Sequence, residues 1–248
     1  MGNDKLKRGF DLESETYDKY RNQQYFMQNV RILENLLEGR NGKVLEIGCG
    51  TGMYVKEFRN RGYEMVGVDY SEKMCAIARK NVEGMGNPQE IIKHSDAEES
   101  LGFEDVFSAI VVMDCWEFFP NPSRVIQNVY NSLMDDGMLV IITVNPWFAP
   151  VIVLCEHLRI KKNRPAFHYY NSFQHRTKRM AMGFSLVNLI KTYWGMKYLY
   201  VFKKNANNLD RVELNSINTS AVSCRHDNII DSKYSPCWIR NDLHKQYG

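Results

Sequence analysis

The sequence predicts an α/β protein built on a doubly wound, mostly parallel sheet. Between residues 43 and 144, apolar strand-like runs alternate five times with helical patterns. Such alternation favours a parallel sheet with helices on both faces. The run 106–113 is almost continuously apolar, as expected for a strand that is buried on both faces. A glycine-rich turn follows the first strand-like run, where a parallel sheet offers its ligand-binding edge.

Hydrophobic spacing, helix caps and glycine stops predict the individual elements. A helical pattern covers 12–38, with a break near Arg21 and Asn22. The expected strands are 43–48, 65–68, 90–93, 106–113 and 138–144, and the helices between them are 51–61, 71–82 and 125–134. Beyond Asn145 the alternation stops, and it returns as a helix over 172–182 and strands over 185–193 and 197–203.

The bulk composition is that of an ordinary globular protein, with 44% hydrophobic and 25% charged residues. A net charge of +3 gives no general reason to expect a polyanionic partner. The six cysteines include no C-x-x-C pair and no zinc spacing, so we expect reduced thiols and no metal site. Residues 1–8 lack the apolar core of a signal peptide, and the longest uncharged apolar run, 146–155, is too short to span a membrane. We therefore expect a cytoplasmic protein.

The most informative motif is the run Val-Leu-Glu-Ile-Gly-Cys-Gly-Thr-Gly over 44–52. Glycines at alternate positions let the backbone turn sharply and approach a ligand without an intervening Cβ. A strand, a tight glycine turn and a helix N-terminus together form a nucleotide-binding crevice. A dinucleotide fingerprint, G-x-G-x-x-G, requires glycine at position 53, where this chain has Met53. The motif thus excludes the dinucleotide fingerprint.

The spacing Glu46-x-Gly48-x-Gly50-x-Gly52 resembles motif I of the class I S-adenosylmethionine (SAM)-dependent methyltransferases, of the type that acts on small molecules. The resemblance is close over 40–144 and looser over 12–203. It implies the Rossmann-like methyltransferase fold, a seven-stranded sheet that ends in an antiparallel hairpin, with SAM as the methyl donor.

The resemblance also implies a SAM pocket at successive strand ends. The glycine turn meets the methionyl part, Asp69 accepts hydrogen bonds from the ribose hydroxyls, and Asp96 receives the adenine amino group. Residues 116–119, Trp-Glu-Phe-Phe, stand where many relatives line the site of transfer. The expected cofactor-binding residues are Tyr20, Arg21, Glu46, Gly48, Cys49, Gly50, Gly52, Asp69, Tyr70, Met74, Asp96, Ala97 and Met113.

Three regions organise the chain in this interpretation: an N-terminal helical cap over 1–38, a SAM-binding domain over 39–205, and an extension over 206–248 that packs on the domain. For the cap, an ordinary amphipathic helix is the alternative. A substrate insert occupies 146–182, and within it 155–180 carries seven basic residues against one acidic residue. This insert suits a lid over a small substrate, a membrane-surface patch or an RNA-binding surface.

We therefore expect an enzyme that moves the methyl group of SAM to an oxygen, nitrogen or carbon atom of a small molecule. His168 is the candidate general base, with Tyr169 behind it. The alternatives are an RNA methyltransferase and a methyltransferase that reaches a lipidic substrate at the membrane surface. Aminopropyl transfer from decarboxylated cofactor and cofactor binding without catalysis also stay open. The sequence leaves the acceptor and the oligomeric state undefined.

Overall fold

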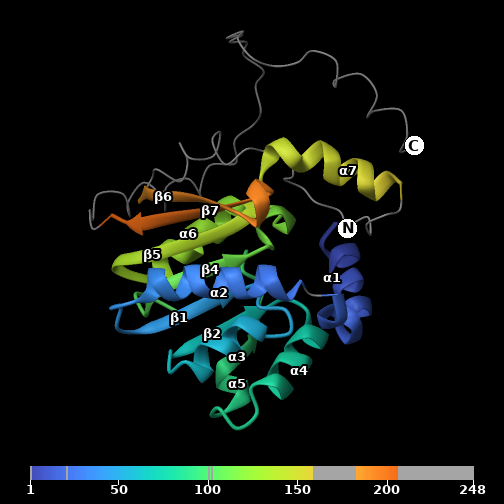
Figure 1. Cartoon of the computed structure of the whole chain (residues 1–248). Helices are drawn as coiled ribbons and strands as arrows, with labels where there is room; N and C mark the ends of the chain where they lie inside the picture. Colours follow the sequence, from blue (N-terminus) through green and yellow to red (C-terminus); the bar gives the residue numbers. More distant parts are fainter. Residues whose placement is uncertain (1, 21, 100, 102, 159–182, 206–248) are drawn as a thin grey trace, which may run out of the picture. The chain divides into compact units, whose positions relative to one another are not determined.

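A computed structural model describes residues 2–20, 22–99, 101, 103–158 and 183–205 (Figure 1). Its centre is one seven-stranded sheet of order β3-β2-β1-β4-β5-β7-β6. The strands are β1 (Lys43–Ile47), β2 (Met65–Asp69), β3 (Ile92–His94), β4 (Phe107–Met113), β5 (Leu133–Val144), β6 (Phe184–Thr192) and β7 (Lys197–Lys204). β7 pairs antiparallel with both of its neighbours, and the first five strands pair in parallel. The predicted mostly parallel, seven-stranded sheet is confirmed.

The helices surround this sheet in the order that the sequence pattern indicates, with several additions. They are α1 (Gly2–Glu13), α2 (Gln23–Leu37), α3 (Met53–Asn60), α4 (Glu72–Asn81), α5 (Pro88–Ile91), α6 (Pro122–Ser132) and α7 (Ala149–His157). Short 3-10 turns are η1 (Ser14–Tyr20), η2 (Trp116–Phe118), η3 (Pro146–Phe148) and η4 (Tyr193–Gly195). None of these helices, within the described ranges, is long and apolar enough to cross a membrane.

Helix starts and stops account for most differences from the expected boundaries. The break near residue 21 is real, because Asn22 caps α2 by accepting a hydrogen bond from the Tyr25 amide. Pro88 starts a short helix where strand was expected, because proline suits the first turn of a helix. The sequence reading missed α1 and α7, and the expected helix over 172–182 and the extension over 206–248 lie outside the described residues.

Alternation along the buried strands divides the core between the two faces of the sheet. Val111 of β4 shares a hydrophobic cluster with residues of α2 and α3, such as Leu33 and Phe58. On the opposite face, the Lys204 ammonium of β7 lies 4.7 Å from the ring centroid of Tyr130 in α6. Figure 1 shows α2 crossing one face of the sheet. The sheet therefore lies between two packed layers.

Gly67 of β2 keeps the glycine turn close to the sheet. A Cβ at this position would lie 2.8 Å from both the Cβ and the Sγ of Cys49, and 3.0 Å from Val55. Cys49 is the central residue between two turn glycines and is buried. A strand glycine often marks such a close approach of another backbone. Gly67 therefore sets how closely the turn after β1 packs against β2.

The substitution Gly67→Ala should lower the free energy of unfolding by about 1–3 kcal/mol, because the added methyl group overpacks a closed interior. Urea denaturation measures the change. Gly9→Ala is the matched control, since a Cβ there meets no atom within 4 Å. Glycine in a helix costs roughly 0.5–1 kcal/mol relative to alanine, so the control should be neutral or slightly stabilising. Equal effects of the two substitutions would contradict the packing argument.

Candidate active site

A cavity opens at the carboxyl ends of β1, β2 and β4. It encloses about 800 Å³ of empty space, its open mouth included. Its walls come from the strand ends, from the turn after β3 and from the N-terminal helices. The lining residues are Phe10, Tyr17, Ile47, Gly48, Gly50, Val68, Asp69, Tyr70, Met74, Ser95, Asp96, Ala97, Glu98, Met113, Asp114, Cys115, Phe118, Phe119 and Pro120. This edge of a parallel α/β sheet is where such folds bind nucleotides.

Asp69, the last residue of β2, joins two turns of the cavity wall. Its Oδ2 accepts a hydrogen bond from the Gly50 amide at 2.8 Å, and its Oδ1 accepts one from the Ser71 amide at 2.9 Å. Burial raises the pKa of the Asp69 carboxyl above its ordinary value, although these two amides act in the opposite direction. A carboxylate has about four lone-pair sites, so both oxygens can also accept hydrogen bonds from a ligand.

The glycine turn provides a backbone surface that faces the cavity. Gly48 and Gly50 have φ values of +70° and +54°, in the left-handed region that glycine adopts without strain. A Cβ at Gly48 would collide with Cys115, whereas a Cβ at Gly50 would meet no atom within 4 Å. The space beside Gly50 is therefore open, and any ligand there approaches the main chain directly.

A second part of the wall follows β2 and β3. Tyr70 and Met74 lie at the start of α4, and Asp96 and Ala97 lie in the turn after His94. The Asp96 Oδ1 accepts a hydrogen bond from the Glu98 amide at 2.9 Å, which fixes that turn. Burial raises the pKa of the Tyr70 phenol, which therefore stays protonated. These residues form a mixed polar and apolar surface that suits a purine ring.

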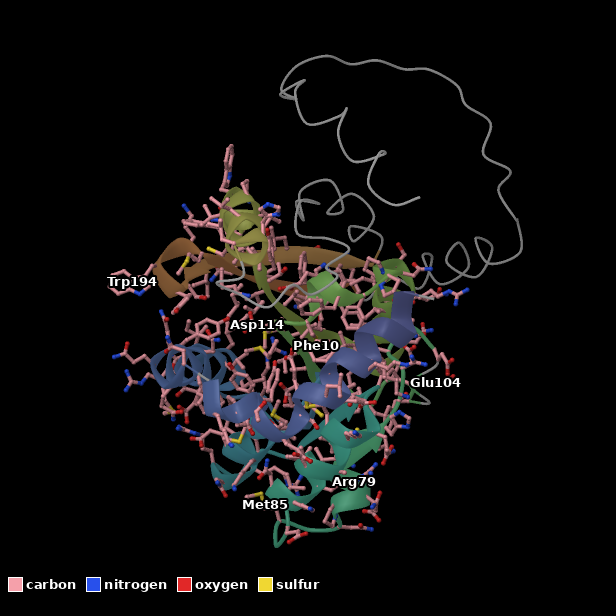
Figure 2. All side chains as sticks on the ribbon, turned by 90° about the vertical axis from the view of Figure 1, so that its right-hand side faces the viewer. Phe10, Arg79, Met85, Glu104, Asp114 and Trp194 are labelled. Carbon is pink, nitrogen blue, oxygen red and sulfur yellow. The ribbon has the colours of Figure 1, made fainter. Side chains whose placement is uncertain are left out.

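The N-terminal segment contributes Phe10 and Tyr17 to the wall of the same cavity, and its role as a cap stays a prediction. Phe10 of α1 packs edge-on against Phe118, with 5.6 Å between ring centroids. The Ser71 hydroxyl donates to Asp11, and the Thr51 hydroxyl donates to Asp18 at 2.9 Å. Figure 2 places Phe10 and Asp114 in the same central region of the molecule, while Trp194 points outwards.

Eight of the predicted cofactor-binding residues line the cavity together: Gly48, Gly50, Asp69, Tyr70, Met74, Asp96, Ala97 and Met113. Three others stand behind the wall. Glu46 is buried within β1, Cys49 is buried against Gly67, and Gly52 begins α3 with its Cα beside Ala78. Arg21, His168, Tyr169 and the side chain of Tyr20 lie outside the described residues.

From the resemblance, sequence reasoning expected the strand end Met113-Asp114-Cys115 to offer a backbone carbonyl to the methionyl amino group. It did not identify the Asp114 side chain or Phe10 as parts of the wall. Of the expected run 116–119, Phe118 and Phe119 line the cavity, whereas Trp116 and Glu117 are buried away from it. A 3-10 turn causes this division, because it rotates consecutive side chains to different sides. The position of Asp114 directly after β4 was the available signal.

In the described part of the chain, no group of three or more His, Cys, Asp or Glu side chains is placed to hold a metal ion. The four cysteines within that part are Cys49, Cys75, Cys115 and Cys155, and no disulfide joins them. Burial raises the pKa of the Cys49 and Cys115 thiols, so neither is prepared to act as a thiolate.

The strand order, the glycine turn and the acidic residue at the end of β2 define a nucleotide-binding α/β protein of the class I methyltransferase type. A family model for the methyltransferase domain matches residues 17–188. The chain belongs to this methyltransferase family.

Named relatives share part of this chain. A phosphatidylethanolamine N-methyltransferase from Cereibacter sphaeroides is 33% identical over 107 residues, which cover 43% of this chain and 52% of the relative. A malonyl-[acyl-carrier protein] O-methyltransferase from Bacillus cereus is 30% identical over 144 residues, 56% of this chain and 52% of the relative. The chain spans about half the length of the curated relatives it matches.

A solved structure shares the fold at low identity. A SAM-dependent methyltransferase from Thermotoga maritima superposes with a TM-score of 0.62 at 17% identity, covering 79% of this chain and 98% of the other. At this identity the comparison supports the arrangement of the sheet and its helices.

Replacing Asp69 with alanine should lower the free energy of unfolding by about 2–6 kcal/mol, because two amides lose their acceptor at about 1–3 kcal/mol each. Asp69→Asn keeps one oxygen acceptor and should lose roughly half as much. Urea denaturation of the two variants and the wild type measures the difference. Equal stability of Asp69→Ala and the wild type would show that the two turns do not depend on this carboxylate.

Proposed function

We propose that the protein transfers the methyl group of SAM to a small-molecule or lipid acceptor. The observation that carries this proposal is the pairing of a buried Asp69 carboxylate with open space beside Gly50 at one cavity edge. A ribose diol fits the carboxylate, and a flexible chain fits the exposed glycine backbone. Family membership supports the same use of the cavity.

The residues of the cavity suit each part of SAM. Asp69 would accept from the ribose hydroxyls, Asp96 and the Ala97 amide would meet the adenine, and the turn at Gly48 and Gly50 would face the methionyl chain. When bound, SAM supplies a sulfonium-linked methyl group that an electron-rich acceptor can take. The protein contributes the position of the acceptor against that methyl group, which is a large part of catalysis in an in-line displacement.

The named relatives support an acceptor in the small-molecule or lipid class. Their names refer to phosphatidylethanolamine, malonyl-[acyl-carrier protein] and ubiquinone biosynthesis. Two of these are membrane lipids or belong to their biosynthesis, and none is a nucleic acid. We therefore favour a small-molecule or lipid acceptor over RNA. The cytoplasmic location stays a prediction from the sequence.

A lipidic acceptor receives additional support from α7. The helix carries apolar side chains on several sides, and Figure 1 shows it projecting away from the sheet. Its exposed apolar residues, together with those of its flanks, are Trp147, Val151, Val153, Leu154 and Leu158. The sequence continues directly into four basic residues within 159–164. Apolar residues beside lysines and arginines suit the interface of an anionic membrane.

The substitution Asp69→Asn should weaken SAM binding at least about tenfold, because a hydrogen bond to a charged group contributes about 1.5–3 kcal/mol. Isothermal titration calorimetry with SAM measures the dissociation constant. Asp135→Asn is the matched control, since Asp135 is exposed on β5 and does not line the cavity. Unchanged affinity in Asp69→Asn would remove this carboxylate from the cofactor site.

The double substitution Val151→Ser and Leu154→Ser should reduce binding to anionic phospholipid vesicles at least about tenfold, because burying one such side chain contributes about 1.5–3 kcal/mol. Vesicle sedimentation measures the bound fraction. Leu12→Ser, which changes an 81% exposed leucine of α1, is the control and should bind as the wild type does. A wild-type protein that stays in the supernatant would contradict a membrane-surface role for α7.

A further inference from the structure

A cluster of four polar side chains lies at the end of β4, beside the cavity. The Lys197 Nζ is 2.7 Å from the Asp114 Oδ1 and 3.8 Å from the Glu117 Oε1. The Tyr25 hydroxyl contacts both Asp114 oxygens, at 2.9 and 2.7 Å, and donates to this carboxylate. Lys197 begins β7, Glu117 lies in η2 and Tyr25 lies in the first turn of α2. Side chains from β7 and α2 thus contact one carboxylate, Glu117 joins the cluster through Lys197, and the Asp114 carboxylate lines the cavity.

The backbone around this cluster adopts uncommon conformations. Asp114 has a φ of +57°, and Tyr193 and Trp194 have φ values of +48° and +58°. Tyr193 belongs to the same neighbourhood, because its ring centroid lies 4.9 Å from that of Tyr25. Positive φ is uncommon for residues other than glycine, and such strain concentrates at functional sites. The fold therefore holds Asp114 in one orientation at a local conformational cost.

The charge states of the supporting residues follow from their surroundings. Burial by itself lowers the pKa of Lys197, but the charges of Asp114 and Glu117 outweigh it and raise that pKa above its ordinary value. Burial and the Asp114 charge raise the pKa of the Tyr25 phenol. Lys197 is thus an ammonium and Tyr25 a neutral donor. With two carboxylates and one ammonium, the cluster has a formal charge of −1.

The described lining of the cavity also carries a negative formal charge. Four carboxylate side chains line it, those of Asp69, Asp96, Glu98 and Asp114, and no Lys, Arg or His is among its described lining residues. Asp69 ends β2 and Asp96 lies in the turn after β3, where the proposed function puts the ribose and the adenine. Asp114 follows β4, which the strand order separates from β2 by β1. Asp114 is therefore the lining carboxylate on the far side of the glycine turn from the proposed ribose and adenine positions, and a cation fits it.

We propose that Asp114 is a catalytic residue that binds and deprotonates a primary amine acceptor, with Lys197 and Tyr25 as positioning residues. This inference rests on the proposed function. An ammonium group has no lone pair, so it must first give one proton to the Asp114 carboxylate. The nitrogen lone pair then forms the bond to the methyl carbon, and the carbon–sulfur bond breaks with its electron pair left on sulfur. The methylated ammonium leaves, and Asp114 returns its proton to solvent.

The test uses the full-length protein and SAM with a tritiated methyl group. One set of acceptors contains primary amines: phosphatidylethanolamine vesicles, ethanolamine and phenethylamine. The other set contains catechol and malonate. The wild type should label the amines. Asp114→Asn should lower that labelling at least about a hundredfold, the usual contribution of a general base, and should leave the dissociation constant for SAM by calorimetry within about threefold.

Variants of the positioning residues separate orientation from folding. Lys197→Met and Tyr25→Phe should each lower kcat about tenfold or more while SAM still binds, and Lys197→Arg should restore much of the loss because it keeps the charge. Lys203→Met is the matched control, since Lys203 lies on the same strand and pairs with Asp136 at 3.0 Å on the surface. This control should retain wild-type kcat and SAM affinity.

Three results would overturn the inference. Asp114→Asn could lose SAM affinity as much as it loses turnover, which would assign Asp114 to the methionyl end of the cofactor. Label could appear on catechol or malonate and on no amine. Asp114→Asn could keep full turnover while His168→Ala loses it, which would identify His168, in the 146–182 insert, as the general base. A wild type that fails to bind SAM at all would instead overturn the proposed function.

Discussion

The Asp69 carboxylate is the interaction on which the rest of the site depends. It receives the Gly50 amide from the turn after β1 and the Ser71 amide from the turn after β2. These two turns carry the walls on either side of the cavity, so one side chain sets the distance between them. Both amides offset part of the cost of burying the charge, and the carboxylate lines the cavity. One group thus supports two turns and also forms part of the cavity wall.

The central sheet was readable from the sequence because its signals are local. Apolar runs, helix caps and glycine stops lie within a few residues of one another. The parallel topology then determines the order in which the strand ends lie along the edge of the sheet. Asp69 and Asp96 could be expected at the cavity because each lies at or just beyond the end of a predicted strand, and both line it. Glu46 was assigned to the ligand by the motif, although the strand buries it. Side-chain direction within a tight turn, as at Cys49, depends on packing that the motif does not encode.

The polar cluster around Asp114 could not be predicted from the sequence, since it is built by contacts between distant segments. Tyr25 and Asp114 are separated by 89 positions, and Lys197 comes from a strand that inserts antiparallel beside β5. None of the three belongs to a short motif. Helix α1 lies within the expected helical cap over 1–38 but was not predicted as a separate helix. Half of its residues are charged, and only Phe10 among its described side chains lines the cavity. The Asp114 cluster is therefore a property of tertiary structure.

The attachment of the N-terminal segment has a consequence for the stability of the cavity wall. Asp11 and Asp18 hold α1 and η1 to the loops through the hydroxyls of Ser71 and Thr51. Hydrogen bonds of this kind contribute about 1.5–3 kcal/mol each, so the two together contribute about 3–6 kcal/mol, against the 5–15 kcal/mol typical of unfolding a whole domain. The two carboxylates therefore couple the N-terminal segment to the loops that follow β1 and β2. A change that weakens either loop also loosens the part of the wall that Phe10 and Tyr17 provide.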